Sequence, residues 1–301
     1  MQTKESQITG TQLIQGLTGV LASCLIWLSG CTTLLSPIIG ESNPHLLLGK
    51  PSPATSFNAK DYLVLRPQYA LSYNRDKGTA NWASWQLNET WLGNLPRSEF
   101  TTDGSLPQGW YQVSPGDYTG SGFDRGHLVP AADRNQTAAD SQAVFLMTNI
   151  LPQAPDNNQG PWERLESHCR ELVRQGKELY IIAGRVGAGG NGLKGSQAVI
   201  GKGRISVPAQ LWKIVVILDR PGLGIGDITE DTPVIAVMMP NRQGIKGMNW
   251  RNYQTTIDQI EQQTGYDFLA NVPDPIQSKL ESKSGLSTML RSIDQLEQKA
   301  E

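Results

Sequence analysis

Residues 120–135 read G-S-G-F-D-R-G-H-L-V-P-A-A-D-R-N, and this stretch does most to decide the fold. Gly122 and Gly126 allow tight turns, so the backbone can bring side chains close together. Arg125 carries a permanent planar positive charge that suits a phosphate group. His127 can exchange a proton near neutral pH. The stretch therefore predicts a short strand that presents a proton acceptor beside a bound anion.

A second informative segment, residues 149–170, reads N-I-L-P-Q-A-P-D-N-N-Q-G-P-W-E-R-L-E-S-H-C-R. Asn158, Trp162, Glu166 and Arg170 recur every four residues, so they share one face wherever the segment is helical. Mg²⁺ prefers oxygen ligands and keeps several waters, so one amide oxygen from Asn158 can suffice to hold it. The segment predicts a cation site next to the start of a helix.

Each of these residues also has a purely structural interpretation. His127 alone would fit a hydrogen-bonded core histidine, and Asn158 alone would fit a helix cap. Glu166 alone would fit a solvated helix residue paired with Arg170. The joint occurrence of a base, a cation ligand and arginines favours a site for hydrolysing phosphodiesters. Asn157 remains the alternative to Asn158 as the metal ligand.

The motifs together resemble one known family. Asp124-Arg-Gly-His, followed by Asn149-Ile-Leu-Pro-Gln, Asn158 and Trp162-x-x-x-Glu166, is similar to the DNA/RNA non-specific endonucleases. The resemblance runs from about residue 62 to residue 272. It implies an α+β protein with the ββα-metal nuclease fold, in which a central, largely antiparallel sheet is flanked by helices.

The resemblance also implies an activity and roles for individual residues. The activity would be Mg²⁺-dependent hydrolysis of DNA and RNA without sequence preference, with Mn²⁺ as a possible replacement. His127 matches the general base, Asn158 the protein ligand of the metal, and Glu166 the carboxylate that orients water or assists the leaving oxygen. Arg125 and Arg97 match catalytic arginines that bind phosphate, and Arg170 is a further phosphate contact.

Two other functions are compatible with the same residues. One is a catalytically silent envelope lipoprotein that binds nucleic acid, and the other is a structural envelope lipoprotein. A cleavage assay distinguishes both from an enzyme. The sequence leaves the oligomeric state open and does not indicate an inhibitor protein.

The N-terminal part is typical of an exported lipoprotein. Residues 13–27 are mostly apolar and too short for a comfortable membrane span, as in a signal peptide. They are followed by Leu28-Ser-Gly-Cys31, which resembles a bacterial lipobox, and lipidation of Cys31 would anchor the chain to a membrane. A cleaved signal without lipid, or an uncleaved anchor, is the alternative. We expect a periplasmic or cell-surface protein, or otherwise a secreted one.

The expected domains follow from this pattern. They are a signal segment over residues 1–31, a tether rich in Ser, Pro, Thr and Gly over 32–56, the endonuclease domain over 57–275, and a polar helical tail over 276–301. If cleavage precedes Cys31, the only cysteine left is Cys169, which we expect to be a buried apolar residue rather than a nucleophile.

Hydrophobic patterning predicts the main elements. Strand-like runs lie at 62–66, 69–74, 82–87, 178–183, 213–218 and 234–239, and helical patterns at 162–174, 253–264 and 275–300. Strands and helices are segregated, which indicates an α+β class rather than an alternating βαβ array.

The charge distribution limits the kind of partner. The formal net charge is −2, whereas a protein that stores nucleic acid passively is usually basic overall. Residues 184–218 contain Arg185, Lys194, Lys202, Arg204, Lys213 and no acidic residue. This predicts a local basic surface facing a substrate, unless the imbalance is a chance property of solvated loops.

Overall fold

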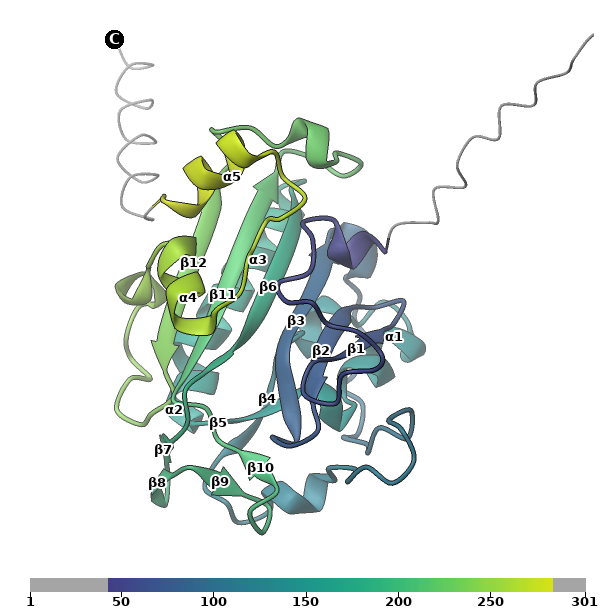
Figure 1. Ribbon diagram of the computed structural model, residues 1–301, viewed down its shortest axis with the longest axis vertical. Coiled ribbons are helices and arrows are strands. Elements are labelled where there is room, and N and C mark those ends of the chain that lie inside the picture. Colours follow the sequence, from purple (N-terminus) through teal and green to yellow (C-terminus); the bar gives the residue numbers. More distant parts are fainter. Residues whose placement is uncertain (1–42, 284–301) are drawn as a thin grey trace, which may run out of the picture. The chain divides into compact units, whose positions relative to one another are not determined.

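The computed structural model describes residues 43–283, and its centre is a six-stranded antiparallel sheet (Figure 1). The strand order is β1-β2-β3-β6-β11-β12. The bounds are β1 Tyr62–Leu65, β2 Ala70–Asn74, β3 Thr79–Leu87, β6 Glu178–Val186, β11 Gln210–Leu218 and β12 Val234–Pro240. The long, nearly continuous apolar runs of β6 and β11 form its buried middle. The α+β class and the antiparallel sheet are thereby confirmed.

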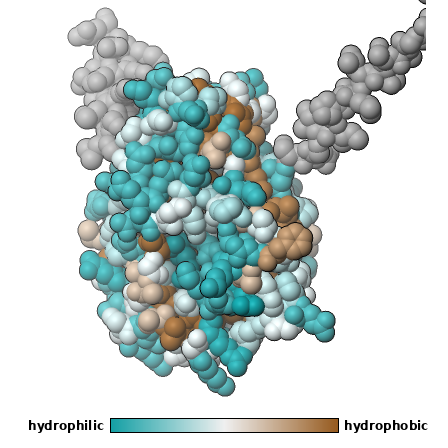
Figure 2. Space-filling view, in the orientation of Figure 1, coloured by the Kyte–Doolittle hydropathy of each residue, from teal (hydrophilic) through white to brown (hydrophobic). Residues whose placement is uncertain are grey.

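Side chains alternate between the two faces of this sheet, and each face has its own core. In β6, Ile181 and Ala183 belong to one hydrophobic cluster, whereas Tyr180 and Ile182 belong to the other. The first face is covered by α1 (Ala138–Val144) and α3 (Glu163–Arg174), and the second by α4 (Ile257–Thr264) and α5 (Asp274–Glu281) (Figure 1). The side that carries α4 and α5 is mostly hydrophilic, with hydrophobic residues in scattered patches (Figure 2).

A smaller antiparallel pair lies apart from the main sheet. It joins β4 (Asp124–His127) to β5 (Ile150–Gln153), and α2 (Pro155–Asn157), a π-helical turn (Asn158–Trp162) and α3 follow. The two hairpins β7 (Gly190–Gly192) with β8 (Gly195–Gln197) and β9 (Val199–Ile200) with β10 (Ile205–Ser206) complete the strands. Short 3-10 helices span Pro44–Leu46, Glu89–Trp91, Pro115–Tyr118, Ala131–Asp133, Met147–Asn149, Ile225–Asp227 and Trp250–Tyr253. The sequence β4-β5-α2-α3 is the ββα unit that the motifs predicted.

Three expected helices differ at their ends. Helix α3 begins at Glu163, because Gly160 has non-helical angles (φ −122°, ψ −119°) and interrupts the preceding turn. The helix expected at 253–264 begins only at Ile257, where the Thr256 side chain caps it by accepting from Gln259 N, and it ends at left-handed Gly265. Helix α5 ends at Glu281, and residues 284–301 of the expected tail lie outside the described residues.

The described part of the expected tether is packed against the domain, so that prediction is wrong for residues 43–56. His45 is 2% exposed and its Nε2 lies 2.7 Å from the carbonyl oxygen of Pro67. Leu48 and Ala54 are also buried, in the cluster on the α4–α5 face. Cys31 and the rest of 1–42 lie outside the described residues, and within 43–283 no helix is long and apolar enough to cross a bilayer.

Two of the basic residues expected on the substrate-facing surface are buried. Arg185 is 7% exposed in β6, and Lys213 is 1% exposed in β11. Their neighbours in the strands are apolar, so counting charges along the chain overestimated the basic surface. Cys169 is buried in α3 as predicted, and burial raises the pKa of its thiol to about 12.

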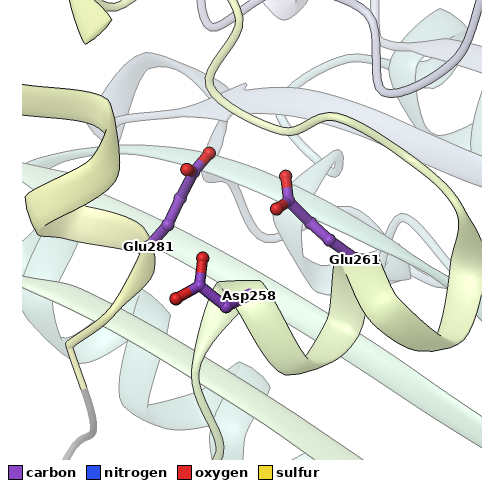
Figure 3. Close-up of side chains that lie close together, drawn as sticks. All are labelled: Asp258, Glu261 and Glu281. Atoms are coloured by element: carbon purple, nitrogen blue, oxygen red, sulfur yellow. The ribbon is translucent and has the colours of Figure 1, made fainter.

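Three acidic side chains converge on the far side of the sheet from α3. Asp258 and Glu261 of α4 face Glu281 at the end of α5, and their carboxylate oxygens lie within 4.8 Å of one another (Figure 3). Glu281 is 7% exposed. Burial, with smaller contributions from the two neighbouring carboxylates, raises the pKa of Glu281 to about 7. Ionisation of Glu281 therefore opposes folding.

Replacing Glu281 with Gln should stabilise the protein above pH 7. The folded-state pKa exceeds the unfolded value, so the stability linked to this carboxyl is present below about pH 4.5 and lost as the pH rises through 7. Glutamine keeps an oxygen to accept from Gln277 Nε2 (2.9 Å). We expect a gain on the order of 1 kcal/mol, or roughly 2–4 °C in Tm, at pH 8.

Thermal unfolding at pH 8 and pH 4.5 checks this. The gain should vanish at the lower pH, and exposed Glu89→Gln should show no such dependence on pH. An equal gain at both values would contradict the assignment of an ionisation penalty to Glu281.

Candidate active site

The predicted site residues line one cleft. Its volume is about 530 Å³, and it lies between the loop that precedes α1, strand β4 and the α2–α3 segment. All six residues singled out in the sequence border it: Arg97, Arg125, His127, Asn158, Glu166 and Arg170. The fold thus brings together Arg97 and Arg170, which lie 73 residues apart in the chain.

His127 ends β4 and its ring is wedged between two phenylalanines. The ring centroids lie 5.4 Å from that of Phe100 and 4.8 Å from that of Phe145, the latter edge-on at 77°. Nε2 is inaccessible to solvent and has no hydrogen-bond partner among the described residues. Burial, and then the charge of Arg97, lower the pKa of His127 to about 3. The imidazole is therefore neutral at physiological pH and can accept a proton.

Asn149 fixes the chain immediately after His127. Its side chain is fully buried, and Oδ1 accepts from the backbone nitrogen of Val129 at 3.0 Å. Nδ2 donates to the carbonyl oxygens of Val129 and Val144, both at 2.9 Å. An apolar side chain here would leave three buried backbone groups without partners, which explains an asparagine within an apolar run.

Asn158 is held by its nitrogen, which leaves its oxygen available. Nδ2 donates to Asp124 Oδ2 at 2.9 Å, and Gln159 Nε2 donates to the same oxygen at 2.8 Å. No described residue donates to Asn158 Oδ1. Asn157, the alternative ligand, is fully buried, and its amide group is used by Gln153 and by the carbonyl oxygen of Pro240. The structure thus separates the two asparagines, and only Asn158 borders the cleft.

The donor set fits a hard divalent cation that keeps much of its water. Asn158 Oδ1 is an oxygen ligand, as Mg²⁺ prefers. Within residues 43–283, the only place where three His, Cys, Asp or Glu side chains could converge on an ion is the Asp258 cluster, on the other face of the sheet. A multi-carboxylate cage of the kind that binds Ca²⁺ is therefore not available in the described part of the cleft.

The arginines are positioned by different means. Arg125 donates through Nη2 to the carbonyl oxygen of Pro115 at 3.0 Å, and its guanidinium lies 5.3 Å from the centre of the Phe100 ring. Arg97 is exposed, and its guanidinium lies 5.1 Å from the centre of the Phe145 ring. Arg170 pairs with Asp133, with 3.0 Å between Nη1 and Oδ1. All three arginines border the cleft.

Asn135, the last residue of the stretch 120–135, supports the loop that carries Arg97. Its Oδ1 accepts from Gly93 N at 2.8 Å and its carbonyl oxygen accepts from Leu95 N at 3.3 Å. A Cβ on Gly93 would lie 2.4 Å from that carbonyl oxygen, so only glycine allows this approach.

Glu166 lies at the wall of the cleft in a mixed electrostatic environment. Its side chain is 13% exposed and Oε1 lies 3.3 Å from Lys213 Nζ. Burial raises the pKa of Glu166, and the nearby Asp133 adds to this effect. Lys213 and Arg170 act in the opposite direction.

Sequence reasoning missed several residues of the site. Gln159 and Glu163 also border the cleft, seven and three residues before Glu166. The spacing of four residues could have identified them. The pairing of Lys213, which lies behind the cleft wall, with Glu166 could not be found in this way, because Glu166 lies 47 residues earlier in the chain.

Comparison with known proteins gives a consistent picture. Residues 51–275 match the family model described as DNA/RNA non-specific endonuclease. The chain is 50% identical over 279 residues to a nuclease of Nostoc sp., covering 90% of this chain and 98% of that protein. It is 32% identical over 218 residues to mitochondrial endonuclease G of Homo sapiens, covering 70% of each chain.

A solved structure shares the fold. A crystal structure of an EndoG/EndoGI complex contains a chain that superposes with a TM-score of 0.64 at 23% identity, covering 78% of this chain and 94% of the other. The extent of the family match and the 50% identity show that the chain is a nucleic-acid-hydrolysing enzyme of the DNA/RNA non-specific endonuclease family.

Proposed function

We propose that the protein is a Mg²⁺-dependent endonuclease that hydrolyses both DNA and RNA without sequence preference, with His127 as general base and Asn158 as metal ligand. The observation that carries the proposal is the convergence of a neutral imidazole, a free amide oxygen, a carboxylate and three guanidinium groups on one cleft of about 530 Å³. No base-reading surface is required, because all these groups suit the sugar–phosphate backbone.

In the proposed reaction, His127 takes the proton of the attacking water as the new P–O bond forms. The bond between phosphorus and the 3′ oxygen breaks, which leaves a 5′-phosphate and a 3′-hydroxyl. Arg97 and Arg125 bind the oxygens of the scissile phosphate, and Arg170 binds phosphate on the α3 side of the cleft. Their charges stabilise the extra negative charge that develops at phosphorus.

Asn158 holds the cation through Oδ1 while Asp124 keeps its amide from rotating. When bound, Mg²⁺ neutralises charge on the phosphate and on the leaving oxygen. Mn²⁺ has the same preference for oxygen ligands and would replace it. Glu166 accepts a hydrogen bond from water in the cleft and so orients it, or assists the leaving oxygen.

Mutation of His127 to Ala should abolish most of the cleavage. Loss of a general base typically costs ~10²–10⁴-fold in rate. The measurement is the rate of degradation of plasmid DNA and of total RNA by residues 43–301, with Mg²⁺ and with chelator. Chelator should stop the wild-type protein on both substrates.

A gel-shift assay of the same samples serves as the control. His127→Ala should bind DNA as the wild-type protein does, because the arginines remain. Tight binding by the wild-type protein without cleavage in Mg²⁺ or Mn²⁺ would reject the enzymatic mechanism in favour of a silent binding protein.

Mutation of Asp124 to Ala should raise the Mg²⁺ concentration required for half-maximal rate. Without the carboxylate, Asn158 Nδ2 loses its 2.9 Å partner and the amide can rotate. Residues that orient a metal ligand typically change affinity by 10–100-fold. Asp124→Asn keeps an oxygen acceptor and should have a smaller effect.

The matched control is Asp219→Asn, whose side chain is 85% exposed. It should leave the metal requirement unchanged. Asp124→Ala could instead lower the rate at every Mg²⁺ concentration while the concentration that gives half of the maximal rate stays the same. In that case Asp124 would not act through Asn158.

We further propose export and lipidation at Cys31, with residues 1–31 as signal, on the basis of the lipobox-like Leu28-Ser-Gly-Cys31. In bacteria, the full chain should take up radiolabelled palmitate and fractionate with membranes. Cys31→Ala should lose the label, and Cys24→Ala, which changes the other cysteine within residues 1–42, should keep it. Labelling that persists in Cys31→Ala would refute the assignment.

A further inference from the structure

The side chain of Lys213 is a buried cation in the middle of the main sheet. It lies in β11, opposite Ala183 of β6 and Val237 of β12, and it is 1% exposed. A charge removed from water in this way is unfavourable unless other groups compensate for the lost hydration. The groups that stabilise the buried ammonium therefore indicate the role of Lys213.

The ammonium group has two aromatic neighbours and one carboxylate. Nζ lies 4.1 Å from the centre of the Trp162 ring and 5.7 Å from that of Trp85, as in cation–π contacts. Its anionic partner is Glu166, with Oε1 at 3.3 Å. The aromatic faces stabilise the charge without removing it, and Glu166 is the group through which it reaches the cleft.

Stability alone does not explain a lysine at this position. The neighbours on the same face of β11 are Leu211 and Val215, which are fully buried and apolar. Replacing a buried ion pair with well-packed apolar residues is often neutral or stabilising. The cleft, in contrast, contains a carboxylate whose ionisation is opposed by burial and needs a nearby positive charge.

We propose that Lys213 is a positioning residue that holds the Glu166 carboxylate ionised and oriented toward the catalytic cleft. This rests on the proposed function, in which Glu166 accepts a hydrogen bond from water or assists the leaving oxygen. Lys213 does not border the cleft, so it acts through Glu166 and does not touch substrate.

The charges around Glu166 come from three elements. Lys213 faces it from β11 and Arg170 from its own helix α3, and both lower the pKa of Glu166. Asp133, in the segment after β4, raises it. The neighbouring thiol of Cys169 is neutral, because burial raises its pKa to about 12. Arg170 is already paired with Asp133 at 3.0 Å, and of the two cations Lys213 has the larger effect on Glu166.

Lys213→Met tests the proposal, because methionine keeps much of the length and none of the charge. We expect kcat/KM to fall by roughly 10–100-fold near pH 6, as for other residues that orient a catalytic group. The acid limb of the pH–rate profile should move to higher pH, since loss of the cation raises the pKa of Glu166. The rate should then recover partly at alkaline pH, whereas a packing defect would lower it at every pH.

Three further variants make the test specific. Leu211→Met alters packing on the same face of β11 and should leave the acid limb unchanged. Lys213→Gln keeps a hydrogen-bond donor without the charge, and should shift the limb as Lys213→Met does. In a Glu166→Gln background, Lys213→Met should cause no further shift, because the two side chains act as one unit.

A measurement without metal or substrate separates this inference from the proposed activity. The carboxyl carbon signal of Glu166, identified by its loss in Glu166→Gln, is followed by NMR as the pH is varied in chelator. It should titrate at higher pH in Lys213→Met than in the wild-type protein. Thermal unfolding shows whether each variant is folded. If Lys213→Met does not fold, Lys213→Gln takes its place in the titration.

The possible failures are distinct. If Glu166 titrates at the same pH with and without Lys213, the positioning role is overturned even in an active nuclease. If the titration shifts but the wild-type protein does not cleave nucleic acid, the electrostatic role stands and the proposed function fails.

Discussion

The close approach of β4 to β5 at Gly126 is the contact on which the site depends. A Cβ at Gly126 would lie 2.1 Å from Oε1 and 2.6 Å from Cβ of Gln153, so only glycine leaves room for this side chain. From there Gln153 Nε2 donates to Asn157 Oδ1 at 2.6 Å. One packing contact therefore fixes the residue before His127 relative to the residue before Asn158. Gly126 belongs to the Asp-Arg-Gly-His motif and Gln153 to the Asn-Ile-Leu-Pro-Gln motif, so the two motifs depend on the same contact.

The same constraint requires buried polar groups that tie the ββα unit to the main sheet. Asn241, which follows β12, accepts from Ala154 N at 2.6 Å and donates to the carbonyl oxygens of Pro152 and Pro208 at 3.0 and 2.9 Å. Asn157 Nδ2 donates to Pro240 O at 2.8 Å. Loss of any of these would leave a buried group without a partner, which costs more than the bond itself contributes. The position of Asn157, and with it that of the adjacent Asn158, is thus set by the end of β12, more than eighty residues later in the chain.

Local pattern predicted the parts of the structure that depend on near neighbours. The apolar runs of β6, β11 and β12 specify buried strands, and the spacing of Asn158, Glu166 and Arg170 placed them on one wall of the cleft.

The features that the sequence did not predict depend on contacts between segments that lie far apart in the chain. The start of α3 at Glu163 follows from the break at Gly160, where a Cβ would lie 2.9 Å from the backbone of Lys246. Residues 43–56 have the composition of a tether, but His45 is buried: its Nδ1 accepts from Gln86 N, and its Nε2 donates to Pro67 O. Lys213 sits in an apolar strand, and only the fold reveals that its charge faces Glu166. Composition cannot distinguish a solvated lysine from a paired one, because the pairing is a property of the tertiary structure.

A net charge of −2 is compatible with a nucleic-acid substrate because three arginines gather at the cleft, where they outnumber the two glutamates, Glu163 and Glu166. Arg97, Arg125 and Arg170 border the cleft, and the Asp258 cluster lies across the sheet from α3. At physiological ionic strength the Debye length is about 8 Å, so exposed charges beyond that distance contribute little to the potential in the cleft. The attraction of phosphate to the cleft therefore depends mainly on the charges that border it. An enzyme that must release each product gains from this arrangement, whereas a protein that stores nucleic acid would need positive charge over a far larger surface.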